Sequence, residues 1–171
     1  MSAGAHPSVA GPRLSVQWDV LAVIAVGGAL GSLARWGVGE LVRWDGEGYP
    51  WATFVENVSG AFALGVVMAL LLDVWPPRRY VRPFVGVGLL GGYTTFSTYM
   101  LEALELLAGD RVPLALAYLG GTLVTGLLAV WAGIVLARLV VRLSRRRRRR
   151  RRRRERERSP ASSRRDTRSS S

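Results

Sequence analysis

A run of hydroxyl-bearing residues follows four glycines in the middle of an apolar segment. The stretch is Gly86-Val-Gly-Leu-Leu-Gly-Gly-Tyr-Thr-Thr-Phe-Ser-Thr-Tyr99, within an apolar segment from about residue 81 to 107. Glycine weakens a helix, and Thr and Ser hydroxyls compete with its backbone hydrogen bonds. In lipid, freed backbone groups are tolerated only where they face protein, water or an ion. The stretch therefore predicts a broken membrane helix beside a polar cavity, with a glycine-lined approach of two helices as the alternative.

Polar and aromatic residues in other apolar segments could line a path for an anion. Asn57 lies within an apolar segment, where its amide needs a partner and could donate to a small anion. Phe96 and Tyr99 are three residues apart, and the positive edges of aromatic rings can line an anion path without trapping the ion. Tyr118 and Thr122, four residues apart, place two hydroxyls on one helix face. The alternatives are hydrogen bonds between helices for the polar residues and core packing for the rings.

Charged residues within the apolar segments need an explanation of their own. A guanidinium that faces lipid is costly, so Arg35 is expected to face the bundle or a water-filled vestibule, unless it snorkels to the interface. Glu56 points about 100° away from its neighbour Asn57 on a helix and could pair with Arg35. Glu102 and Glu105 mark either the outer mouth of a pathway or a polar helix end.

Four apolar segments are long enough to span a bilayer, at about Val20–Val42, Trp51–Leu72, Val81–Leu107 and Val112–Val141. Each exceeds the roughly 20 residues that cross a hydrocarbon core of about 30 Å. Short connections with turn signals predict that neighbouring segments pack antiparallel. The predicted fold is an all-α membrane protein with four transmembrane helices over residues 20–143, the third broken at mid-membrane.

The net charge of +12 lies entirely at the C-terminal end, where residues 144–171 hold fifteen Arg against three acidic residues. A neutral, hydrophobic body with a basic end favours a membrane protein with a cytoplasmic appendage over a nucleic-acid-binding protein. Ten consecutive arginines, Arg145–Arg154, repel one another, so the tail is expected to be disordered, with lipid heads or nucleic acid as adventitious partners. Residues 1–19 are expected to form a flexible leader.

Three motifs together resemble the CrcB/Fluc fluoride channels. They are Gly-Gly-Ala-Leu-Gly-Ser-Leu-Ala-Arg35-Trp, Thr53-Phe-Val-Glu-Asn57-Val-Ser-Gly and Gly91-Gly-Tyr-Thr-Thr-Phe-Ser-Thr-Tyr99. The resemblance covers about residues 20–140. It implies a four-helix subunit that forms an antiparallel dimer with two fluoride pores and one structural sodium ion at the interface.

The resemblance also implies roles for individual residues. Gly91 and Thr94 would give backbone carbonyls to the sodium ion, and Arg35 would lie near the vestibule. This chain departs from the family pattern at Tyr99, where the second pore phenylalanine is expected, and at Glu56, where the residue is usually apolar. The implied pore residues are Asn57, Phe96, Ser97, Thr98, Tyr99, Tyr118 and Thr122.

The basic residues outside the spans are unevenly divided between the two sides of the membrane. With both termini in the cytoplasm, Arg43 and Arg111 lie outside, while the inner side holds the tail together with Arg78, Arg79, Arg82, Arg138 and Arg142. This imbalance predicts a single orientation in the cell membrane. A subunit with one orientation favours an antiparallel heterodimer with a related subunit over a homodimer.

These features predict a fluoride-selective channel subunit that exports fluoride passively and partners with no specific nucleic acid. It is not expected to be an enzyme, because no nucleophile–base pair and no metal-ligand cluster appears in the sequence. One alternative is a small four-helix proton-coupled exporter that depends on Glu56 or Glu102. Another is a structural or nucleic-acid-tethering protein that uses the Arg tail.

Overall fold

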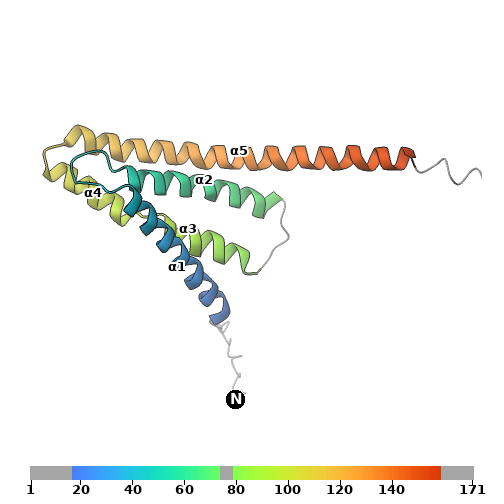
Figure 1. Cartoon of the computed structure of the whole chain (residues 1–171), viewed down its shortest axis with the longest axis horizontal. Helices are drawn as coiled ribbons and strands as arrows, with labels where there is room; N and C mark the ends of the chain where they lie inside the picture. The colour runs from blue at the N-terminus through green and yellow to red at the C-terminus, as the bar shows by residue number, and fades with distance from the viewer. Residues whose placement is uncertain (1–16, 74–78, 159–171) are drawn as a thin grey trace, which may run out of the picture.

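A computed structural model describes residues 17–73 and 79–158, with side chains as far as Arg145. Every regular element in these ranges is helical, which confirms the all-α prediction (Figure 1). The predicted leader, up to residue 16, and the last part of the tail, from residue 159, lie outside the described residues. The elements are α1 (Trp18–Leu41), α2 (Trp51–Asp73), the π-helix η1 (Arg82–Leu89), α3 (Leu90–Tyr93), α4 (Ser97–Ala108) and α5 (Val112–Arg158).

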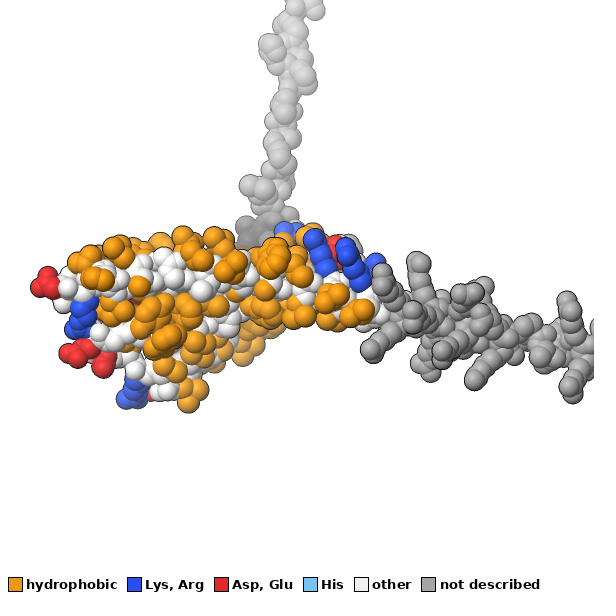
Figure 2. All heavy atoms as spheres, turned by 90° about the horizontal axis from the view of Figure 1, so that it is seen from above, with side chains coloured by type: hydrophobic (Ala, Val, Ile, Leu, Met, Phe, Trp, Pro, Cys, Tyr) orange, Lys and Arg blue, Asp and Glu red, His pale blue; other side chains and the backbone are white. Residues whose placement is uncertain are grey.

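Three stretches of helix are long and apolar enough to cross a membrane, namely Trp18–Leu41, Trp51–Asp73 and Val112–Arg145. The remaining apolar segment, predicted as one span over 81–107, is divided among η1, α3 and α4. Large apolar side chains remain exposed along the flanks, including Leu127 and Trp131, while charged side chains gather at the two ends (Figure 2). Helices that are apolar on all sides are typical of a protein whose solvent is lipid.

Small residues let the helices pack closely. α1 packs against η1 and α3, while α2 runs beside the first part of α5 (Figure 1). A Cβ atom added at Gly27 of α1 would lie 2.5 Å from the Phe84 carbonyl oxygen, and one added at Gly31 would overlap the Leu89 carbonyl oxygen. The glycine-lined approach between helices is therefore present, and it brings α1 against the segment that precedes the Thr-rich run.

Helix α5 continues beyond the apolar bundle as far as Arg158. The disordered tail predicted from residue 144 is therefore wrong over residues 144–158. Extending a helix that has already formed costs much less than nucleating one, and Arg is a good helix former. The Arg145 guanidinium also donates to the Asp73 carbonyl oxygen at 2.9 Å, which ties this part of α5 to the last residue of α2.

Gly31→Ala tests the close packing of α1. The new methyl group would overlap the Leu89 carbonyl oxygen, and overpacking of this kind lowers the free energy of unfolding by about 1–3 kcal/mol. Gly37→Ala on the same helix is the control, because no atom lies within 4 Å of its added Cβ. Thermal unfolding in detergent should show a lower midpoint for Gly31→Ala alone, and equal midpoints for both variants would contradict the packing.

Candidate functional site

The helical backbone is interrupted between α3 and α4, at Thr94, Thr95 and Phe96. Thr94 adopts an extended conformation with φ −82° and ψ 156°. The Thr95 amide donates to Oδ1 of Asn57 at 2.9 Å, and Nδ2 of Asn57 donates to the Thr95 carbonyl oxygen at 2.9 Å. The Asn57 carboxamide thus replaces the helical partners of both Thr95 backbone groups.

The interruption frees two carbonyl groups on the α3 side. In a continuous α-helix the Thr95 amide would bond the Gly91 carbonyl, and the Thr98 amide would bond the Thr94 carbonyl. Here the Thr95 amide donates to Asn57, and the Thr98 amide donates to Oγ1 of Thr95 at 3.2 Å. The carbonyls of Gly91 and Thr94 therefore lose their α-helical donors.

A cavity of about 310 Å³ is lined by Gly91 and Thr94 together with Asn57 and Gly60. Residues 17–73 and 79–158 contain no group of three or more His, Cys, Asp or Glu side chains that could hold a metal ion. Oxygen ligands suit hard cations, and the freed carbonyls of Gly91 and Thr94 are groups of this kind. This is the donor set that the resemblance implies for sodium.

Four of the predicted pore residues, Asn57, Phe96, Tyr99 and Thr122, line another cavity of about 390 Å³. Its lining contains amide, hydroxyl and aromatic groups among apolar ones, and no charged side chain. Oγ1 of Thr122 is buried and has no hydrogen-bond partner, the one buried side-chain polar atom of the described residues in that state. This cavity is called the Asn57 cavity below.

The other predicted pore residues lie elsewhere in the described structure. Tyr118 is completely buried, and its hydroxyl donates to Oε2 of Glu102 at 2.6 Å, so it does not form a ladder with Thr122 in the Asn57 cavity. Ser97 is exposed, with its hydroxyl 3.4 Å from Oγ1 of Thr95. Thr98 accepts a hydrogen bond from Oγ1 of Thr95 at 3.0 Å. Thr95 therefore connects these residues, although the sequence analysis gave it no role of its own.

Of the two roles expected for Glu102, the polar helix end is wrong, because its carboxyl group bonds to other helices and lines a cavity together with Arg35. Glu102 is 8% exposed and accepts hydrogen bonds from Tyr118 and, at 2.8 Å, from Oγ1 of Thr53. Glu105, three residues further along α4, is exposed. The spacing of these residues could not reveal this arrangement, because the donors come from α2 and α5, far away in the sequence.

The hydroxyl group that distinguishes Tyr99 from phenylalanine is held by the backbone of α5. It donates to the Leu119 carbonyl oxygen at 2.6 Å, and the Tyr99 ring meets the Tyr118 ring edge-on with centroids 5.1 Å apart. The Phe96 ring lies 6.1 Å from the Tyr99 ring. Tyr99 therefore keeps its ring at the Asn57 cavity while its hydroxyl bonds to a neighbouring helix.

Arg35 lines a third cavity, of about 400 Å³, which is called the Arg35 cavity below. Thr98, Glu56 and Glu102 also line it, so Glu56 and its neighbour Asn57 face different cavities. The ion pair that Arg35 could form with Glu56 is not present. The ion pairs among the described residues are Arg43–Glu40, Arg79–Asp19 and Arg138–Asp73.

The fold defines a helical membrane protein with several spans and with polar cavities beside an interrupted helix. The family model described as CrcB-like protein, Camphor Resistance (CrcB), matches residues 22–134. The chain belongs to the CrcB family, which confirms the resemblance seen in the three motifs.

Relatives of known name are similar over most of the described chain. Fluoride-specific ion channel FluC 2 of Nocardia farcinica is 46% identical over 127 residues, which is 74% of this chain and 91% of the relative. Fluoride-specific ion channel FluC 1 of Streptomyces coelicolor is 43% identical over 138 residues, 81% of this chain and 88% of the relative. The FluC protein of Rhodospirillum centenum is 40% identical, over 71% of this chain and 98% of the relative.

Proposed function

We propose that this chain is a subunit of a fluoride-selective channel that exports fluoride passively and lowers its cytoplasmic concentration. The observation that carries the proposal is the Asn57 cavity, in which an amide, a buried free hydroxyl and two aromatic rings meet without any charged side chain. Fluoride is small and strongly hydrated, so a pore must replace its water with several donors. Donor side chains that carry no charge replace this water and still let the ion leave.

The interruption at Thr94–Phe96 is proposed to lie near the middle of the membrane. Asn57 and Gly60, which contact Thr95 and Thr94, lie in the first half of the 23-residue span α2, close to its centre. At that depth the Gly91 and Thr94 carbonyls would hold a structural sodium ion. When bound, the ion supplies a fixed positive charge beside an otherwise uncharged path.

A second subunit is proposed to cover groups that this chain leaves open. Phe96 is 75% exposed, and Gly91 is exposed with no atom within 4 Å of an added Cβ, although both lie beside the cavities described above. An antiparallel partner would place its own interruption against this one. The cation at Gly91 would then lie at the interface between the two subunits.

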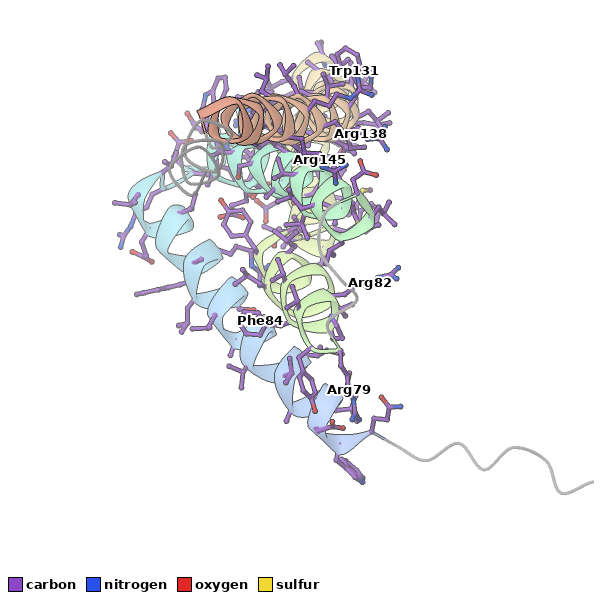
Figure 3. All side chains as sticks on the ribbon, turned by 90° about the vertical axis from the view of Figure 1, so that its right-hand side faces the viewer. Arg79, Arg82, Phe84, Trp131, Arg138 and Arg145 are labelled. Carbon is purple, nitrogen blue, oxygen red and sulfur yellow. The ribbon has the colours of Figure 1, made fainter. Side chains whose placement is uncertain are left out.

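The partner is proposed to be a related subunit of opposite orientation. Arg79, Arg82, Arg138 and Arg145 lie at one end of the bundle, which faces the viewer in Figure 3. Arg43, which pairs with Glu40, and Arg111, which donates to the Gly46 carbonyl oxygen, flank the connections at the other end. Because basic residues are retained in the cytoplasm, the chain takes one orientation in the cell membrane, with both termini inside.

Two other functions remain as competing hypotheses. A proton-coupled exporter would use Glu56 or Glu102, both of which face the Arg35 cavity, and a Glu→Gln change would then abolish transport. A nucleic-acid-tethering role would depend on the Arg run. Deleting residues 146–171 removes that run but keeps the Arg145 bond to Asp73, so a channel would survive the deletion.

Fluoride efflux from liposomes that contain the full chain, alone and with a related subunit, tests the function. We expect Asn57→Asp to lower the efflux rate by about tenfold or more, because the carboxylate repels the anion and cannot donate to Thr95. Ser59→Ala, on the same helix and outside both cavities, should keep the wild-type rate. Unchanged efflux in Asn57→Asp would remove Asn57 from the pathway.

Sodium binding is tested by thermal unfolding in sodium and in potassium at equal ionic strength. A ligand that binds only the folded state raises stability by mass action, by about 2.7 kcal/mol at one hundred times its dissociation constant. We expect a higher midpoint in sodium for the wild type and for Ser59→Ala. Asn57→Ala should lose the difference, since the Thr95 amide can then return to the Gly91 carbonyl. Equal midpoints in both salts for the wild type would exclude the site.

Reporter fusions to the C-terminus test the orientation. One reporter should be active only in the cytoplasm and the other only outside. We expect signal from the cytoplasmic reporter alone, because the arginines at that end are retained inside. A substantial outward-facing population would allow the chain to pair with itself and would remove the reason for a second kind of subunit.

A further inference from the structure

Glu56 is a largely buried residue whose carboxyl oxygens, unlike Oγ1 of Thr122, are not completely buried and have no partner among the described residues. It is 3% exposed, and its carboxyl group makes no hydrogen bond or ion pair with any described residue. Glu56 takes part in a side-chain hydrogen bond only through its backbone, where its carbonyl oxygen accepts from the Ser59 hydroxyl. Because Glu56 lines the Arg35 cavity, this carboxyl group is available to a proton or to an ion in that cavity.

The charges around this cavity do not balance when every group is ionised. Arg35 and Glu40 face it from α1, Glu56 from α2, and Glu102 from α4. Glu40 is neutralised by its ion pair with Arg43. One guanidinium then faces two buried carboxylates, and an uncompensated buried charge is costly. Holding one proton on a carboxyl group restores neutrality.

Hydrogen bonding decides which carboxyl group holds that proton. Glu102 accepts from the hydroxyls of Thr53 and Tyr118, and donors of this kind stabilise the ionised form. Glu56 accepts from no donor among the described residues. Glu102 therefore keeps its charge through these two donors, and Glu56, which has no such donor, is the group that carries the proton.

We propose that Glu56 is the proton-binding group of this subunit and that its protonation sets the rate of fluoride passage through the Arg35 cavity. The inference rests on the proposed function. Protonated Glu56 leaves the cavity neutral and offers an O–H donor to the anion. Ionised Glu56 gives the cavity a net negative charge, which opposes the passage of fluoride between this cavity and the Asn57 cavity.

The two cavities are connected through one chain of contacts. Thr98 lines the Arg35 cavity and accepts from Oγ1 of Thr95, and the Thr95 backbone pairs with Asn57. Glu56 also directly precedes Asn57 in the sequence, so a change of charge at Glu56 acts close to the Asn57 carboxamide. The proton stays on the carboxyl group and is not carried with the ion, which distinguishes this device from proton-coupled export.

Fluoride efflux should be measured over a series of pH values, equal on both sides of the membrane. We expect wild-type efflux to fall about tenfold as pH rises through the titration of Glu56, the effect of one added charge at short range in a partly buried cavity. Glu56→Gln should keep the low-pH rate at every pH. Glu105→Gln, a surface carboxyl change on α4, should follow the wild type. A wild type without pH dependence, or Glu56→Gln with the wild-type dependence, would overturn the inference.

Infrared spectroscopy of the purified chain tests the proton directly and does not depend on transport. The stretch of a protonated carboxyl group should be present at neutral pH in the wild type and in Glu105→Gln, and absent in Glu56→Gln. A band that persists in Glu56→Gln would refute the assignment even if the variant conducts. A wild type that shows the band but no efflux at any pH, either alone or with a related subunit, would instead refute the proposed function.

Discussion

The structure depends on the reciprocal hydrogen bonds between the Asn57 carboxamide and the backbone of Thr95. In lipid, each backbone group left without a partner costs several kcal/mol, so a helix cannot be interrupted there unless another group takes over its bonds. One carboxamide supplies both an acceptor and a donor, and it satisfies the Thr95 N–H and C=O together. The interruption is stable because Asn57 of α2 supplies these bonds. The carbonyls of Gly91 and Thr94 stay without a donor from Asn57, because Asn57 bonds to Thr95 alone.

The interruption and the glycine contacts are parts of one arrangement, although the sequence analysis treated them as alternatives. Thr94 can lie against α2 only because Gly60 leaves room for its methyl group. Gly27 and Gly31 likewise let α1 approach the backbone of η1 and α3. A larger residue at Gly60 would push Thr94 away and separate Thr95 from Asn57. Close packing therefore determines where the freed carbonyls lie.

Local pattern predicted the helical spans and the special stretch at residues 86–99, while the resemblance implied the set of pore residues, of which Asn57, Phe96, Tyr99 and Thr122 line one cavity. The prediction that Tyr118 and Thr122 line the same path was wrong. A four-residue spacing places two side chains on one helix face but does not determine which neighbouring residue each of them contacts. Tyr118 donates to Glu102, and Thr122 lines the cavity. The predicted disorder of the Arg run is wrong over residues 144–158 for another reason. Extending the existing helix α5 costs little, and this outweighs the repulsion between the arginines.

The separation of charge between the cavities follows from which helix face each residue occupies. Glu56 and Asn57 are adjacent in sequence, yet the helical rotation of about 100° sends one to the Arg35 cavity and the other to the Asn57 cavity. The acidic side chains of Glu56 and Glu102 thereby face the same cavity as Arg35. The Asn57 cavity holds no charged side chain, and its neutral polar groups are the ones that, under the proposed function, replace the water around a small anion. A carboxylate moved by one position along α2 would end that separation, since it would place a negative charge where the anion must lose its water.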